Sequence, residues 1–525
     1  MNFVDHLNIF GVEAKEIPSI TGSGAPTTAT EGAVGCLYMD SDTGELYKCT
    51  AAAAENYTWE IFGGGGNTGE AAGTSVCSLD ELKRAIANGS KNIELGASFE
   101  VGEQVSLPNG TCLNGCNYTI TRSTGYEGTL FALGSNCRIK AITINGNREN
   151  MVSPTWDKTK EIATSSDCVV EDVTIENGNE AIIVYGCDVV VRNCKVTNCG
   201  GNGVHFSGAN RSRVENCVII NSNLKAGMGH EDGGIIWSDQ CCDTVVENNY
   251  VENAKCAFGS IDADHNSSIK IIGNTARNCL KAVAGIFQAS IPTNLIVSNN
   301  QFVDCVEFQI NRVDGGETSE VNWIISNNLF DNTKLYLVRV AHCVICGNVF
   351  KNAPSYHALE TSKHLTITGN HFSRANATPL LYLPNNSFIT FEGNTAVLTS
   401  DADTSNTVFN IQGTSVGYVV KGNVFEVNSD KHTGKVVQFM GGGDICEGNR
   451  ISIKSGTGIA VGSNMNCSNN VIICASAEQQ AILAYGGCVN TVIANNLSNG
   501  TFKINSSNVT NVNNMACAGL EFATE

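Results

Sequence analysis

Paired aspartates in this sequence could supply the two carboxylates of a glycoside-cleaving site. Asp239 and Asp262 each follow a short apolar run, and the two runs are related by a shift of 23 residues, from Ile235 to Phe258. If that shift equals one structural repeat, the carboxylates lie about 5 Å apart. Mutual repulsion then raises the pKa of one acid and leaves the other ionised, which is the division that glycoside hydrolysis needs. This short separation suits a retaining mechanism, whereas a pair two repeats apart would suit an inverting one.

An insertion before the first apolar run adds further chemical groups. Residues 221–234 fall in a repeat of 32 residues, and insertions of this kind form surface loops that often carry function. The predicted catalytic residues are Asp239, Asp262, Asp264, Glu231, Asp232 and His230. The structural alternative is that the aspartates only form turns, by bonding to their own backbone.

A second chemistry, polysaccharide lysis, would need a basic residue and usually Ca²⁺ held by acids. Arg339 beside Glu360 is the closest match to that arrangement. We therefore predict a hydrolase in preference to a lyase, with no cofactor, and with Ca²⁺ only if the chain is a lyase. No zinc site is predicted, because Cys343 and Cys346 have no partner pair at zinc spacing.

A stripe of polar and aromatic residues could bind an extended sugar chain. In strands, alternate residues share a face, so the middle residue of Val204-His-Phe206 is expected to point outward, and the same register can be applied to later repeats. The predicted substrate-binding residues are His205, Trp237, Gln309, Asn311, Arg339, Glu360, Tyr382, Asn410 and Gln438. The alternative is that these residues only form a solvated surface, since any solvent face of such a fold is polar.

These residues must be positioned by a repeating structure. An aliphatic residue, one or two polar residues and then Asn recur from Val191-Arg-Asn-Cys194 to Ile493-Ala-Asn-Asn496, with twelve steps that span 302 residues and so a period of about 25. Short alternating runs lie between the copies, and helical spacing is missing from them. Units this small bury a core only by stacking. The sequence predicts an all-β, right-handed parallel β-helix of about sixteen coils.

The recurring Asn residues and many of the 23 Cys residues have structural explanations. Asn tolerates the left-handed conformation that a tight bend needs, and stacked Asn side chains can hydrogen-bond along a ladder. Cys residues recur at equivalent positions, such as Cys194 and Cys217, and are expected to fill stacked interior or turn sites as small apolar groups.

Composition narrows the class of partner. The net charge of −19 argues against a nucleic-acid partner, because phosphate binding needs clustered Lys and Arg. No run of 18 apolar residues occurs, and the start of the chain lacks the pattern of a signal peptide, so no membrane insertion is expected. Polysaccharide or protein partners remain.

The chain divides into five predicted segments. They are a tail-attachment segment (1–20), a small β-hairpin module (21–62), a Gly-rich linker (63–75), a capping helix with the first coil (76–110) and the parallel β-helix (111–525). The helix is expected over 78–88, with Ser78 and Glu81 in a capping box and Gly89 after its end. A helix placed there covers the open end of the solenoid core.

Two resemblances bear on function. GAPTT, GCLYMDSDTGELYKCT and YTWE resemble a module near the N-terminus of phage and prophage tail fibres of Gram-positive bacteria. The helix followed by LPNGTCLNGCNYTI and the coils is similar to the pectin-lyase-like β-helix superfamily, in particular to phage tailspikes and depolymerases. These resemblances imply attachment to a phage tail or baseplate protein, a homotrimer, and a location in the virion tail after synthesis in the host cytoplasm.

Three functional hypotheses follow. The first is a tailspike or receptor-binding protein of a phage or phage-tail-like particle, which binds and depolymerises bacterial surface polysaccharide along the β-helix face. The second is an adhesive tail fibre without catalysis. The third is a free polysaccharide lyase or epimerase. New reducing ends or unsaturated uronate after incubation with polysaccharide would separate them.

Overall fold

The structure is a computed structural model of the chain. It describes residues 19–23, 25–27, 30, 37–40, 46–53, 56–61, 73–154, 158–223, 233–262, 266–287, 293–312, 319–374, 380–399 and 405–520. The chain forms two compact units, Met1–Gly73 and Thr74–Glu525. The predicted tail-attachment segment lies outside the described residues except for its last two positions, and so does most of the predicted linker.

The first unit contains a four-stranded sheet in the order β1 (Ser19–Gly22), β2 (Leu37–Asp40), β3 (Leu46–Ala53) and β4 (Asn56–Ile61). Strands β2 and β3 pair antiparallel, and β4 pairs antiparallel with β3. The predicted hairpin and its third strand are therefore confirmed. Strand β1, which was not predicted, adds in parallel to β2.

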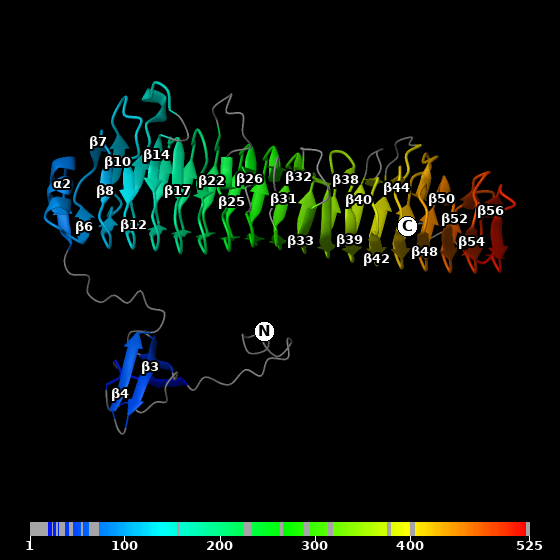
Figure 1. The fold of residues 1–525 in the computed structure, drawn as a ribbon, viewed down its shortest axis with the longest axis horizontal. Coiled ribbons are helices and arrows are strands. Elements are labelled where there is room, and N and C mark those ends of the chain that lie inside the picture. Colours follow the sequence, from blue (N-terminus) through cyan, green and yellow to red (C-terminus); the bar gives the residue numbers. More distant parts are fainter. Residues whose placement is uncertain are drawn as a thin grey trace. The chain divides into compact units, whose positions relative to one another are not determined.

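The second unit begins with β5 (Thr74–Val76) and helix α2 (Leu79–Ala87). The backbone N–H of Glu81 donates to Ser78 Oγ at 3.3 Å, which confirms Ser78 as the N-cap. Glu81 Oε2 accepts from the Cys77 N–H at 2.7 Å, one residue before the N–H that a capping box uses. Leu82 and Ala85 are buried, and α2 lies at the end of the stack where β6 (Asn92–Leu95) begins (Figure 1). Among the described residues, no helix is long and apolar enough to cross a membrane.

The remaining strands form three parallel sheets that run the length of the stack, one strand per sheet in each coil (Figure 1). Sheet 1 runs from β5 through β9 (Cys112–Asn114) to β57 (Val509–Val512), and sheet 2 from β7 (Phe99–Val101) to β58 (Met515–Ala516).

Sheet 3 positions the candidate site. Its strands are β8 (Val105–Leu107), β11 (Phe131–Leu133), β14 (Lys160–Ala163), β17 (Glu180–Val184), β20 (Val204–Ser207), β23 (Gly233–Ser238), β26 (Cys256–Asp262), β29 (Lys281–Phe287), β32 (Glu307–Arg312), β35 (Lys334–Val338), β38 (His357–Glu360), β41 (Leu381–Pro384), β44 (Phe409–Gln412), β47 (Lys435–Gln438), β50 (Thr457–Val461), β53 (Gln480–Ala484) and β56 (Thr501–Ile504).

The predicted parallel β-helix is confirmed. Sheet 3 has sixteen described strands after residue 111, from β11 to β56, which agrees with the expected number of coils. The interior is apolar along its length and includes a stack of phenylalanines, in which Phe330 and Phe350 lie 4.5 Å apart and Phe350 and Phe372 lie 4.7 Å apart between ring centroids. Alternate residues of each strand supply this core, because side chains alternate between the two faces of a strand.

An asparagine ladder joins the coils at one bend. In each coil from Asn249 to Asn496, the backbone N–H of the Asn donates to the side-chain oxygen of the Asn one coil later, as from Asn328 to Asn348 at 2.9 Å, and the side-chain amides bond in series. The ladder consists of Asn249, Asn274, Asn300, Asn328, Asn348, Asn370, Asn394, Asn423, Asn449, Asn470, Asn496 and Asn514. The preceding residue, such as Asn327 with φ 55°, takes the left-handed conformation. The two roles expected of one Asn are thus divided between neighbours.

The cysteines occupy the positions expected of them. Cys194 and Cys217 precede the asparagine ladder in the same column, and the Cys217 N–H donates to Asn249 Oδ1 at 2.8 Å. Both thiols are buried and free. They act as small apolar groups in the stack.

Candidate functional site

One line of outward-facing residues runs along sheet 3, and we call it the outer column. Strand pairing aligns its members on successive coils as Ile183, His205, Ile236, Gly259, Ala284, Gln309, Tyr336, Ala358, Tyr382, Asn410, Gln438, Ala460, Leu483 and Lys503. Its apolar members do not belong to the interior cluster; Ile236 and Ala284 instead form a small cluster of their own with Cys256. The predicted register therefore holds for Gln309, Tyr382, Asn410 and Gln438.

Two predicted members of the stripe lie elsewhere. Arg339 follows β35 in a left-handed turn with φ 58°, and Glu360 pairs with Val338 at the end of the strand. Their coils present Tyr336 and Ala358 in the outer column instead. The prediction missed Tyr336 because it placed the strand three residues too late, although the alternation in Lys334-Leu-Tyr-Leu-Val338 carries the correct register. The side chain of Asn311 lies outside the described residues.

Tyrosines and one lysine gather at the centre of the outer column, and we call this group the tyrosine platform. Lys334 Nζ lies 4.3 Å from the ring centroid of Tyr336 and 5.1 Å from that of Tyr356, and Tyr356 packs edge-on against Tyr382 at 5.4 Å. All four side chains are half-buried. Burial and the nearby Glu360 raise the pKa of Tyr336, so its hydroxyl stays protonated and can donate.

Polar groups flank the tyrosine platform on both sides. On one side Lys281 donates a hydrogen bond to Gln309 and lies 3.6 Å from Glu307. On the other, Thr407 Oγ1 donates to Gln438 Oε1 at 3.0 Å. Between them Asn410 is 8% exposed, and its Oδ1 has no hydrogen-bond partner within the described part of the chain. A buried acceptor without a partner is costly unless a ligand or water satisfies it.

The predicted substrate-binding role of Trp237 is wrong. Its side chain is 1% exposed, stacks on Phe206 at 5.7 Å and donates from Nε1 to Thr244 Oγ1 at 2.8 Å. Trp237 lies two residues after the inward-facing Ile235, so it shares the same face of the strand and joins the core.

His205 lies in the outer column as predicted, but it is not water-facing. It is 6% exposed and has two strong partners: Nδ1 lies 2.8 Å from Glu180 Oε1, and Nε2 lies 2.8 Å from Ser238 Oγ. Glu180 is fully buried and accepts from the backbone N–H and the side-chain amide of Asn202, at 3.1 and 3.0 Å. The Glu180–His205–Ser238 chain thus crosses three successive coils. The sequence pattern did not reveal it, because its members come from different columns.

The acid pair does not occupy equivalent positions. A register shift between Trp237 and Ser238 aligns Asp262 with Ser238, so Asp239 stands one residue further on. Asp239 has φ 59°, and its Oδ2 accepts from Ser207 and Ser238 at 2.8 Å each. Asp239 therefore lies in a left-handed turn, and the hydrogen bonds to its carboxylate come from serine hydroxyls. Asp264, His230, Glu231, Asp232 and the side chain of Asp262 lie outside the described residues.

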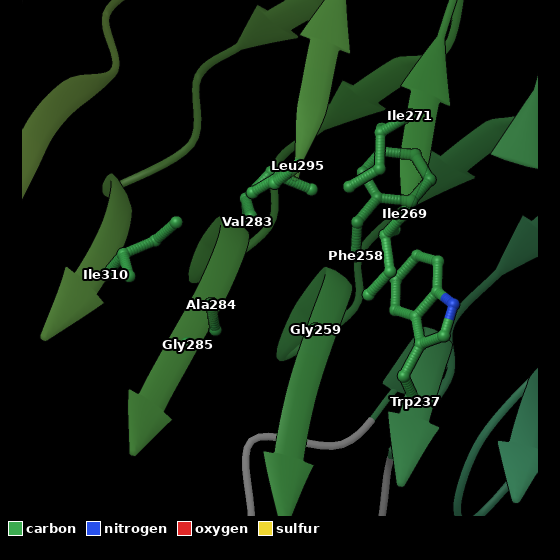
Figure 2. A pocket seen from close by; sticks show the side chains of 10 residues that line it. All are labelled: Trp237, Phe258, Gly259, Ile269, Ile271, Val283, Ala284, Gly285, Leu295 and Ile310. Carbon is green, nitrogen blue, oxygen red and sulfur yellow. The ribbon is translucent and has the colours of Figure 1, made fainter. Parts of the chain in front are cut away.

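A small apolar pocket lies near this region, inside the coils. Trp237, Phe258, Val283 and Ile310 point into it from neighbouring strands (Figure 2), and its volume is about 20 Å³. Its lining side chains are all apolar, so a water molecule would lack the polar partners it needs there. The pocket is a packing defect of the core. Within the described ranges no group of His, Cys, Asp or Glu side chains is arranged to hold a metal ion.

Comparisons with known proteins bear on the fold. Residues 161–330 match the family model of the right handed beta helix region, which confirms the predicted hand. No curated protein matches the chain. Among solved structures, pre-mature gene product 12 of bacteriophage phi29 is 10% identical with a TM-score of 0.45, over 84% of this chain and 71% of that one. A tailspike mutant of Escherichia coli bacteriophage HK620 in complex with pentasaccharide is 14% identical with a TM-score of 0.45, over 73% and 74%. The A-module of a mannuronan C-5 epimerase of Azotobacter vinelandii is 13% identical with a TM-score of 0.35, over 75% and 93%.

Proposed function

We propose that the chain is a tailspike or receptor-binding protein of a phage or phage-tail-like particle, and that it binds bacterial surface polysaccharide along the outer column. The observation that carries the proposal is the tyrosine platform beside the unpartnered Asn410 Oδ1. Tyrosine rings offer flat apolar area with a polar edge, and convergent amide and hydroxyl groups supply orientation. The sequence resemblance of the N-terminal module to tail-fibre modules supports attachment of the first unit to a tail or baseplate protein.

The binding site can be tested with a panel of purified capsular and cell-wall polysaccharides from candidate Gram-positive hosts. Tyr336→Ala and Tyr382→Ala should each weaken binding at least roughly tenfold, because each removes a large contact area at the centre of the platform. Tyr118→Ala is the matched control, since Tyr118 is exposed before β10 (Thr119–Arg122) and far from the outer column in sequence. Equal binding by Tyr336→Ala and the unaltered chain would contradict the proposal.

Depolymerisation is the catalytic part of the proposal, and Asp239 with Asp262 remains its predicted acid pair. Incubation with a polysaccharide that binds should release new reducing ends, and Asp239→Asn and Asp262→Asn should abolish release while binding persists. Binding without any product would instead favour the adhesive fibre. Unsaturated uronate absorbance would favour the lyase, and with it a Ca²⁺ requirement.

A homotrimer is also part of the proposal. The outer face of sheet 1 carries exposed aliphatic residues on separate coils, including Ile324, Val344, Ile445 and Val492. Ile324 and Val344 are paired on adjacent coils, and adjacent exposed aliphatic side chains on a solvent face could form part of an interface between subunits.

A further inference from the structure

The Glu180–His205–Ser238 chain has the connectivity of a hydrolytic triad, and the saccharide-binding proposal does not use it. Ser238 Oγ and Glu180 Oε1 lie on opposite ring nitrogens of His205, each at 2.8 Å. A hydroxyl and a carboxylate on the two sides of one imidazole are the arrangement that activates serine as a nucleophile. The residues come from β17, β20 and β23, which are adjacent strands of one rigid sheet.

Hydrogen bonding assigns a role to each group. Glu180 accepts two N–H donations from Asn202, which orient its carboxylate to accept a hydrogen bond from Nδ1–H of His205. His205 Nε2 is then left as an acceptor for the Ser238 hydroxyl. Gly233 N–H donates to Asn202 Oδ1 at 2.9 Å, which fixes the amide that orients Glu180.

Ser238 also lies 2.8 Å from Asp239 Oδ2, and the Ser238 hydroxyl has one proton for two acceptors. When His205 is neutral, the proton can point to Nε2, while Ser207 continues to donate to Asp239 at 2.8 Å. When His205 is protonated, Nε2 donates to Ser238 Oγ and the hydroxyl turns to Asp239. The two states explain why both contacts are short. Ser238 is buried, at 7% exposed, and the exposed side chain of Asp239 is the next group along the chain of bonds toward solvent.

We propose that Ser238, His205 and Glu180 form an ester hydrolase site that removes ester-linked acyl groups, such as O-acetyl substituents, from a saccharide. The saccharide part rests on the proposed function. His205 and Gln309 are four coils apart in the outer column, a distance of about 19 Å at one strand spacing per coil. The outer-column positions between them include Gly259 and Ala284, whose small side chains protrude little from the sheet.

The reaction balances with water as the only co-reactant. Ser238 Oγ bonds to the acyl carbon while its proton passes to His205 Nε2, and His205 then gives that proton to the departing sugar oxygen. Water next attacks the acyl carbon and gives a proton to His205. The bond to Ser238 Oγ breaks, the carboxylic acid leaves, and the proton returns to Ser238. Ser238 and His205 are the catalytic residues, and Glu180 is a positioning residue.

The test uses the full chain, a fluorophosphonate probe that labels activated serines, and p-nitrophenyl acetate. We expect the adduct, located by mass spectrometry, on Ser238, and this measurement on the unaltered chain needs no variant to fold. Ser238→Ala and His205→Ala should lower ester hydrolysis by roughly 10³-fold or more. Ser298→Ala is the matched control, because Ser298 lies on the outer face of sheet 1 in β30 (Ile296–Ser298).

The Glu180→Gln variant tests whether Glu180 positions His205 for catalysis or has only a structural role. Loss of the carboxylate removes the charge that stabilises protonated His205, so His205 should lose its proton at a lower pH. The pH below which the labelling rate falls should therefore move lower, and the labelling rate at neutral pH should fall. A purely structural glutamate would leave the pH limb in place. An unlabelled chain, or labelling that persists in Ser238→Ala, would overturn the proposal. Small probes need no sugar binding, so their failure is distinct from loss of polysaccharide binding in Tyr336→Ala.

Discussion

At the residue scale, single asparagines join each coil to the next by hydrogen bonds. Each ladder Asn before Asn514 is buried, accepts a backbone N–H and donates both to the next Asn and to a carbonyl, as Asn370 does with Asn394 and with Ile345 O. Such a side chain is fully satisfied only with a neighbour of the same kind above and below. The recurrence of Asn could be read from the sequence, whereas the division between bend and ladder needed the backbone angles.

Replacing one ladder residue should therefore destabilise the coil stack. Asn370→Ala removes the acceptor of the Asn348 N–H and a bond from Asn348 Nδ2, leaving buried donors unpaired, at a cost of about 1–3 kcal/mol for each orphaned group. We expect a clear drop in melting temperature by circular dichroism. Asn508→Ala is the control, because Asn508 is exposed and outside the asparagine ladder, and it should melt close to the unaltered chain. Equal melting of both variants would show that the ladder adds little.

At the scale of elements, helix α2 covers one end of the coil stack. The apolar face of α2 packs against β5 and β7, so it covers the first coil where no further coil can do so. The Ser78 N-cap, the buried Leu82 and the end of the helix could all be predicted from the sequence, because they depend on neighbours within a few positions.

Removing the Leu82 side chain should destabilise only the coils next to helix α2. Leu82→Ala is expected to cost about 2–5 kcal/mol locally, since Leu82 is fully buried. In a stacked solenoid each coil contacts its neighbours alone, so amide hydrogen exchange should speed up in β6 to β8 and stay unchanged beyond β20. Leu280→Ala, at a half-exposed position, is the control. Faster exchange along the whole stack would mean that the coils unfold as one unit.

The three sheets present different surfaces to solvent at the scale of the β-helix as a whole. Sheet 3 bears the outer column with the tyrosine platform, whereas sheet 1 bears the exposed aliphatic line that includes Ile324 and Val344. The proposed saccharide binding and the proposed subunit association therefore use separate faces. The net charge of the whole chain is −19, which argues against a nucleic-acid partner.

The oligomer can be tested independently of sugar binding. Light scattering should give about three times the chain mass of 55.5 kDa, and Ile324→Asp with Val344→Asp should shift the chain toward monomer, because two buried charges would lack partners at the interface. Val152→Asp serves as control, since Val152 is 90% exposed and outside sheet 1. A trimer that survives the double substitution must use another face.

The sequence by itself determined the class of fold, its repeat, the helix cap, the first-unit hairpin and the outer-column positions of Gln309, Tyr382, Asn410 and Gln438. Those features depend on the alternation of apolar and polar residues and on spacing within one repeat. Both can be followed directly along the sequence. Only the tertiary structure decided that Trp237 faces the core, that Arg339 lies in a turn and that a register shift moves Asp262 opposite Ser238. It alone joined Glu180, His205 and Ser238, because contacts between coils depend on how strands of unequal spacing align, and one shifted residue changes every neighbour that follows.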